Sequence, residues 1–156
     1  FSMPERLAAS YINETGERKI PVMLHRAILG SFERFIGILI EHYAGNFPTW
    51  LSPTQVVVMS ITDRNNNTCK KIKEQLSNSG FRTELDIRNE KIGFKIREHT
   101  IQRIPFLIII GDKEEQMNEI SIRTRSGDDL GKMSLDSFKD ILEKEVTSKG
   151  RSEKDD

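Results

Sequence analysis

The sequence lacks several features that would narrow its class at once. Cys69 is the only cysteine, which excludes an internal disulfide and a zinc site built on cysteine pairs and is compatible with a reducing compartment. The 24 basic and 24 acidic residues give a net charge of zero. Any contact with nucleic acid must therefore come from a local basic patch rather than from the field of the whole molecule.

Membrane and export signals are missing as well. No apolar run reaches the ~20 residues of a membrane-spanning helix, and the stretch 36–40 contains Gly37 and is soon followed by Glu41. The opening FSMPERLAAS has no basic stretch followed by an apolar core, as a secretory signal would have. Because the sequence opens on Phe1, we expect it to be an internal part of a longer chain. The single cysteine, which suits a reducing compartment, favours a location in the cytoplasm.

The two prolines of NFPTWLSP separate two regions of different pattern. Before them, KIPVMLHRA (19–27) has the composition of a strand, and GSFERFIGILIEHYAG (30–45) has the length of a helix and is apolar on nearly all sides. Residues 1–20 do not provide the cover that such a helix needs. We expect four segments: a first unit at 1–45, a linker at 46–52, a second unit at 53–147 and a mobile tail at 148–156.

From Ser52 onward, strands and helices alternate. Strands are predicted at 55–61, 81–87, 106–111 and 119–125, and helices within 63–80, 88–104 and 134–146. This order predicts an α/β fold with a mixed, mostly parallel sheet, helices on both faces and the very hydrophobic FLIIIG strand at its centre. On the helix 88–104, Ile92, Ile96 and His99 share one face. Ser134 is the expected N-cap of the last helix.

The segment 88–103 carries the most suggestive charge pattern. Its polar side chains are mainly basic or amide-bearing and include Asn89, Arg97 and Arg103. A solvated helix surface would look the same. The sheet could also bring this segment next to Arg123, and Arg and Asn side chains read base edges, most readily in single-stranded RNA. Taken alone, Arg34 is expected to form an ion pair on a helix surface, because the sequence has no phosphate-binding glycine-rich loop. His25 is expected to be a buried core histidine, because no second metal ligand lies nearby in the sequence.

Longer stretches resemble a known family. HRAILGSFERFIG resembles the third signature motif of class II aminoacyl-tRNA synthetases. RNEKIGFKIREHTIQRIPFLIIIGDKE and the following ISIRTRSGDDLG resemble the anticodon-binding domain of the threonyl-tRNA synthetases, and PTWLSPTQVVVM resembles their interdomain connection. The resemblance covers residues 3–146. It implies that 1–45 is the end of a catalytic domain and that 53–147 is an anticodon-binding domain.

The resemblance also implies roles for individual residues. Arg34 would pack on the adenine of ATP, Ser31 and Ala27 would line the pocket for threonine and its adenylate, and His25 would be one of three zinc ligands. The residues implied to contact anticodon bases are Asn89, Arg97, Arg103, Glu114 and Arg123.

The function implied is that of the C-terminal part of a threonine–tRNA ligase, which uses zinc and Mg-ATP to activate threonine and transfers it to tRNA(Thr). This part would mainly recognise the anticodon, and we expect it to be inactive alone and to hold no cofactor. Its partners would be tRNA(Thr), the rest of the catalytic domain and a second copy in a homodimer. Two alternatives stay open: a module of another class II synthetase, such as the prolyl or glycyl enzyme, and a stand-alone α/β interaction domain without RNA binding.

Overall fold

The computed structural model describes residues 1–150, and the chain divides into two compact units, Phe1–Ile38 and Leu39–Asp156. Residues 151–156 of the expected tail lie outside the described residues. No helix within 1–150 is long and apolar enough to cross a membrane.

The first unit has little regular structure. α1 (Met3–Arg6) precedes an antiparallel hairpin of β1 (Tyr11–Ile12) and β2 (Arg18–Lys19). The strand expected at 19–27 is not found beyond Lys19, and Leu24 is 87% exposed. Its composition suits a strand, but a strand needs a neighbour for its backbone hydrogen bonds, and residues 1–38 provide none there.

The helix expected at 30–45 is confirmed as α2 (Phe32–Tyr43). It ends where Ala44 and Gly45 take positive φ values of 48° and 75°. None of its residues is buried in the part of the chain that the structure describes, and Phe32 is 80% exposed. The apolar surface predicted for this helix is therefore present.

The second unit contains a five-stranded sheet in the order β4-β3-β5-β6-β7. Its strands are β3 (Val56–Ser60), β4 (Thr83–Asp86), β5 (Phe106–Ile110), β6 (Ile120–Thr124) and β7 (Asp129–Met133). β3 runs parallel to β4 and β5, whereas β5–β6 and β6–β7 are antiparallel. The expected mixed sheet is confirmed, with the FLIIIG strand at its centre.

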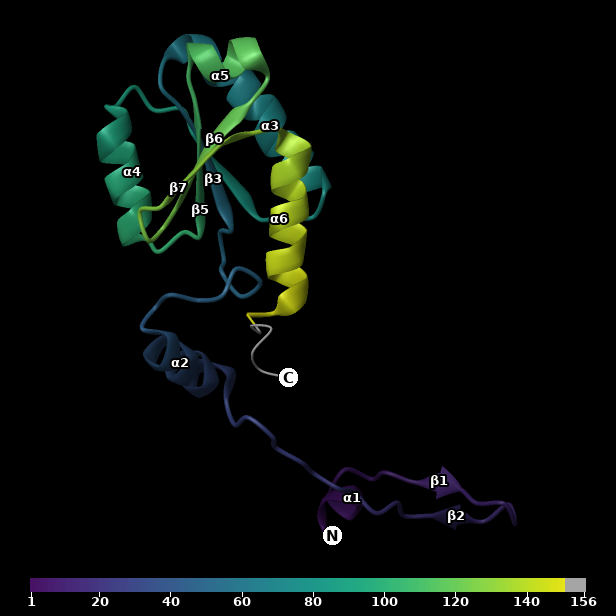
Figure 1. Ribbon diagram of the computed structural model, residues 1–156. Coiled ribbons are helices and arrows are strands. Elements are labelled where there is room, and N and C mark those ends of the chain that lie inside the picture. Colours follow the sequence, from purple (N-terminus) through teal and green to yellow (C-terminus); the bar gives the residue numbers. More distant parts are fainter. Residues whose placement is uncertain (151–156) are drawn as a thin grey trace. The chain divides into compact units, whose positions relative to one another are not determined.

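Helices cover both faces of this sheet. The helical elements are η1 (Asp63–Asn65), α3 (Asn66–Asn78), α4 (Ile92–Ile101), α5 (Asp112–Met117) and α6 (Leu135–Ser148). α4 lies on one face, and α3 and α6 lie on the other (Figure 1). Ser134 is confirmed as the N-cap of α6, because its Oγ accepts a hydrogen bond from the Ser137 amide at 3.2 Å.

The sheet separates two apolar clusters. Alternate residues of β3 point to opposite faces, so that Val56 packs toward α3 and α6 while Val57 packs toward α4. In the larger cluster, Phe138 of α6 meets Phe106 edge to face at 5.5 Å between ring centroids. In the smaller one, Ile92 and Ile96 of α4 pack on the sheet, which confirms the inner face predicted for this helix.

Two elements of the second unit were not predicted. The last strand is expected at 119–125, but the chain turns at Gly127, whose φ is 94°, and returns as β7. The amide of Gly127 donates to the Thr124 carbonyl at 3.0 Å and closes the turn. The short helix α5 follows β5 directly.

The segment expected to be a linker is hydrogen-bonded to the second unit. Arg82 donates to the carbonyls of Ser52 at 2.9 Å and Trp50 at 2.8 Å. Arg125 donates to the Phe47 carbonyl at 2.6 Å, and its burial lowers the pKa of the guanidinium. These contacts occupy Arg125 and fix the path of the chain into β3.

Candidate nucleic-acid interface

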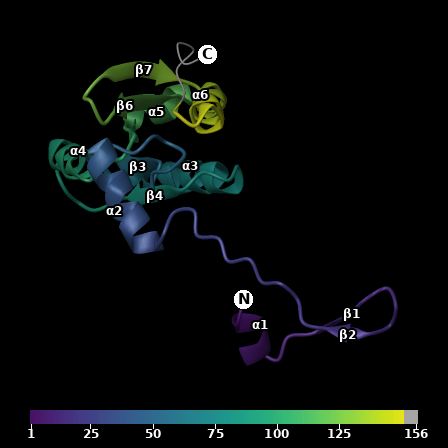
Figure 2. The same cartoon turned by 90° about the horizontal axis from the view of Figure 1, so that it is seen from below.

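One face of the sheet is open along β6 and β7. Arg123 pairs with Leu107 across β5–β6, and Leu107 belongs to the cluster under α4, so Arg123 projects from the α4 side. Ser121 and Lys132 pair across β6–β7 on that same side. Figure 2 shows α4 beside β3 and β4, with β6 and β7 continuing past it. We call the α4 side of β6 and β7 the open face; none of the helices α3 to α6 covers it.

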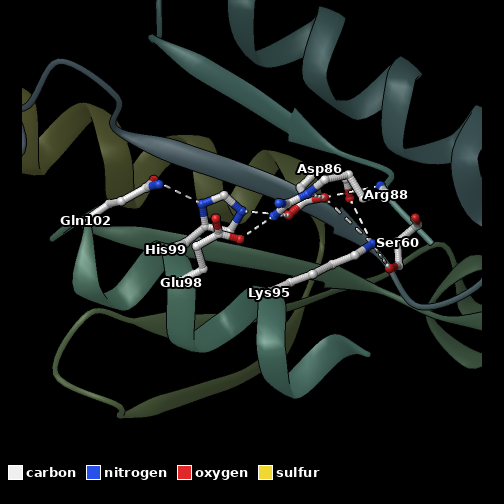
Figure 3. A network of polar contacts seen from close by, with 7 residues as sticks. All are labelled: Ser60, Asp86, Arg88, Lys95, Glu98, His99 and Gln102. Carbon is white, nitrogen blue, oxygen red and sulfur yellow. Dashed lines mark hydrogen bonds and ion pairs between the residues drawn. The ribbon is translucent and has the colours of Figure 1, made fainter. Parts of the chain in front are cut away.

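A buried polar network lies under α4, at the C-terminal ends of β3 and β4 (Figure 3); β5 separates these two strands from β6 and β7. Asp86 is 4% exposed, and its Oδ2 is 2.8 Å from His99 Nε2 and 2.7 Å from Arg88 Nη2. Lys95 is 1% exposed, and its Nζ donates to the carbonyls of Ser60 at 3.0 Å and Asp86 at 3.3 Å. The ammonium thereby ties the end of β3 to the end of β4 from within α4.

The charges in this network stabilise one another. Burial raises the pKa of the Asp86 carboxyl, but the hydrogen bonds from Arg88 and His99 favour the charged form more strongly, so its pKa lies well below the ordinary value. Arg88 also meets Glu98 of α4 at 2.5 Å, and this contact lowers the pKa of Glu98. The network therefore fixes the start of the loop 88–91 against α4.

Two of the residues implied to contact RNA extend from this fixed frame. Asn89 is exposed in the loop immediately after Arg88, and Arg97 is exposed on the outer side of α4. Neither side chain forms a hydrogen bond or an ion pair with any of residues 1–150. Their polar groups are therefore available to a ligand.

Glu114 is much less free. It is 9% exposed, and its Oε2 accepts a hydrogen bond from the Gly111 amide at 3.1 Å, immediately before α5 begins. Its Oε1 is 2.8 Å from Lys132 Nζ, and this contact is the main reason why the pKa of Glu114 is lowered. The carboxylate is held ionised at the edge of the open face and can only accept hydrogen bonds.

The remaining two arginines lie near the other end of β5. Arg103 follows α4 with a positive φ of 63°, and its guanidinium donates to Asn46 Oδ1 at 3.4 Å. Arg123 Nη2 is 3.9 Å from Asp129 Oδ2, and both side chains are about half exposed. Because Arg103 precedes β5 and Glu114 follows it, the five residues of this strand, roughly 16 Å, separate them. These two side chains therefore start from opposite ends of the strand.

The site residues implied in the first unit lie on an exposed stretch. His25, Ala27, Ser31 and Arg34 are all exposed, and the one contact among them is from the Arg34 amide to Ser31 Oγ at 3.3 Å. Residues 1–150 contain no group of three or more His, Cys, Asp or Glu side chains that could hold a metal ion. His25 by itself does not fit a zinc site.

Comparison with known proteins decides the family. Residues 55–145 match the family model described as "Anticodon binding domain". The chain belongs to the anticodon-binding domain family. The match covers every strand of the open face and the whole of α4, so the arrangement described above is that of an anticodon-binding domain.

The relatives of this anticodon-binding domain point to threonyl enzymes. A threonine–tRNA ligase of Prochlorococcus marinus (strain MIT 9211) is 65% identical over 151 residues, which are 97% of this chain and 24% of the relative. One of Marinobacter nauticus (strain ATCC 700491 / DSM 11845 / VT8) is 58% identical, with the same coverage. The chain therefore spans about a quarter of the length of these curated relatives.

Solved structures agree. The crystal structure of the RNA binding domain of threonyl-tRNA synthetase from Cryptosporidium parvum Iowa II has a TM-score of 0.69 at 30% identity, covering 94% of this chain and 36% of that one. The resemblance to threonyl-tRNA synthetases is thus confirmed. A prolyl-tRNA synthetase of Cryptosporidium parvum, at 15% identity and a TM-score of 0.64 over 94% of this chain and 32% of its own, shares the fold alone.

Lys132 is a member of the open face of this anticodon-binding domain that sequence reasoning missed. It lies on β7, a strand that was not predicted, and becomes a partner of Glu114 only through the β5–β6–β7 pairing. A hairpin prediction from the SGDD turn, with Met133 facing the core, would have placed Lys132 on the opposite face of the sheet.

Proposed function

We propose that the second unit recognises the anticodon of tRNA(Thr). The observation that carries this proposal is the open face of a domain that belongs to the anticodon-binding family, where Arg123 and α4 border a strip of sheet. Asn89, in the loop before α4, and Arg97, on α4 itself, are both exposed. A loop of single-stranded RNA with splayed bases fits such a surface better than a duplex does.

The chemistry of the open face suits the anticodon. Threonine anticodons share G and U at their second and third positions. Arg123 can donate to the acceptor edge of G, and Asn89 can both donate and accept. Glu114, held ionised by Lys132, can accept from a ring N–H of either base. These assignments divide the readout between the two ends of β5.

We further propose that the chain acts as part of a longer threonine–tRNA ligase in the cytoplasm. In that protein Arg34 would contact the adenine of Mg-ATP, Ser31 and Ala27 would line the threonine pocket, and His25 would join two further zinc ligands. The relatives, threonine–tRNA ligases about four times as long, support this. Catalysis would require the rest of the catalytic domain and a second copy in a homodimer, and we expect the chain alone to be inactive.

The test is a binding assay with Arg123→Ala. Binding of the tRNA(Thr) anticodon stem–loop, and of a copy changed at the G and the U, is measured at several salt concentrations. We expect the substitution to weaken binding of the unchanged stem–loop by about 1–3 kcal/mol and to abolish the preference for it. The matched control is Lys144→Ala, which removes an exposed cation from α6, on the face of the sheet opposite to the open face.

One result would overturn the role of Arg123, and another would overturn the proposal itself. If Arg123→Ala left both affinity and preference unchanged, Arg123 would not read the anticodon. If the unsubstituted chain showed no salt-dependent binding to either stem–loop, the domain would be an interaction module without an RNA ligand.

A further inference from the structure

Phe94 is exposed, whereas the other phenylalanine side chains of the domain are buried or partly buried. Residues 55–145 contain four phenylalanines and neither tyrosine nor tryptophan. Phe106 and Phe138 are buried, and Phe81 packs against the larger cluster. Phe94, in contrast, is 53% exposed. Its ring is thus a large apolar group left in solvent by its own domain.

The phase of α4 explains this exposure. Successive residues of a helix turn by about 100°, so the side chains that face the sheet, Ile92 and Lys95 among them, place Phe94 on the opposite side. Arg97 lies one turn further along that side. A Cβ added to the neighbouring Gly93 would meet no atom within 4 Å, so the space beside Phe94 is open.

Apart from the buried Lys95, the charged residues nearest to Phe94 along the chain are Lys91, Arg97, Glu90 and Glu98. Arg97 and Lys91 form no ion pair with any of residues 1–150, whereas the nearby Glu98 is engaged by Arg88. An exposed aromatic ring next to unpaired cations is the combination with which proteins hold single-stranded nucleic acid, because the base stacks on the ring and its phosphates meet the cations.

We propose that Phe94 is a stacking platform for an unpaired base of the anticodon loop, with Arg97 holding the adjoining phosphate. This inference rests on the proposed function. A base is a better ligand for Phe94 than another protein would be, because the apolar area on the outer side of α4 is small. A stable protein interface covers about 800 Å² on each partner, whereas the outer side of α4 offers only Phe94 and Ile101, separated by Arg97. One base is enough to cover one ring.

The first test compares two substitutions in the anticodon stem–loop binding assay. We expect Phe94→Ala to weaken binding about 5- to 150-fold, the range for loss of one base–aromatic stack. Phe94→Leu keeps the apolar volume but has no π-face, so it should recover little of the loss. Because the ring is exposed, the urea midpoint of either variant should stay near that of the unsubstituted chain. Met117→Ala, 64% exposed on α5, is the matched control.

The second test detects stacking directly. Phe94→Trp is introduced together with Trp50→Phe, so that the emission reports on position 94 alone. Among the described residues, Trp50 Nε1 has no hydrogen-bond partner, so its removal breaks no hydrogen bond. We expect the stem–loop to quench the emission and an RNA duplex of equal length to leave it unchanged.

The outcomes separate the two proposals. If Arg123→Ala weakens binding but Phe94→Ala does not, the anticodon proposal stands and the stacking inference is wrong. If Phe94→Leu binds as well as the unsubstituted chain, the contact is simply apolar, and stacking is again excluded. If the unsubstituted chain binds no stem–loop, the proposed function fails and the inference fails with it.

Discussion

The buried network around Asp86 allows a quantitative prediction for Asp86→Asn. The substitution keeps the shape of the side chain and removes its charge. Lys95, 1% exposed and 3.8 Å from Asp86 Oδ1, then loses its counter-charge and keeps only the two backbone carbonyls. His99 and Arg88 lose an ionised acceptor. Removing one member of a buried ion pair costs about 3–5 kcal/mol.

This loss is large compared with the stability of a domain of this size. Total free energies of unfolding are about 5–15 kcal/mol, so Asp86→Asn should leave a folded but weakened protein. With a urea dependence of about 2 kcal/mol per molar, the midpoint of urea unfolding should fall by about 2 M. Circular dichroism during a urea titration measures it. Asp140→Asn, at an exposed position of α6, should change the stability by no more than about 0.5 kcal/mol.

The pH dependence provides an independent check. The pKa of Asp86 is lower in the folded chain than in the unfolded one, so its contribution to stability is fully present above about pH 4 and is lost as the pH falls further. The unsubstituted chain should therefore lose more stability between pH 5 and pH 2 than Asp86→Asn does. Equal midpoints at neutral pH and parallel acid profiles would refute the account of this network.

Two further predictions concern single side chains. Burial raises the pKa of the Cys69 thiol to about 12, so a disulfide reagent should label the native chain slowly and the urea-unfolded chain quickly; fast labelling of the native chain would contradict the buried position. Lys132→Met removes the contact that chiefly lowers the pKa of Glu114, so this pKa should rise toward its ordinary value in an NMR titration of the carboxyl carbon, and an unchanged titration would show that the Glu114–Lys132 contact does not form in solution.

The elements that could be predicted are those in which apolar residues form a continuous run or recur at the spacing of a helix. The runs at Val56–Ser60 and Phe106–Ile110 are buried on both faces, and Ile92 and Ile96 mark the inner side of α4. Helix α5 is six residues long and mostly charged, so its sequence has no repeating apolar pattern from which a helix could be predicted. The strand expected at 19–27 shows the converse error, because composition cannot say whether a pairing partner is present.

The candidate site was predictable in its residue types but not in its partners. Glu114 meets Lys132, and Asp86 meets His99, only through strand pairing and the packing of α4 on the sheet. No local pattern encodes such contacts. The exposure of Phe94 is different: it follows from the phase of Ile92 and Ile96, and that phase could be read from the sequence.

The order of the strands has a consequence for aggregation. The outer strands β4 and β7 carry charged side chains, among them Glu84 and Asp129, and the β6–β7 pairing is irregular between Ile122 and Arg123. A bare sheet edge is a template for a strand of another molecule, and charges and bulges along it oppose such growth. The most hydrophobic strands, β3 and β5, lie inside, where both neighbours are already supplied. Crowding many copies together should therefore leave each sheet at five strands, without growth from molecule to molecule along its edges.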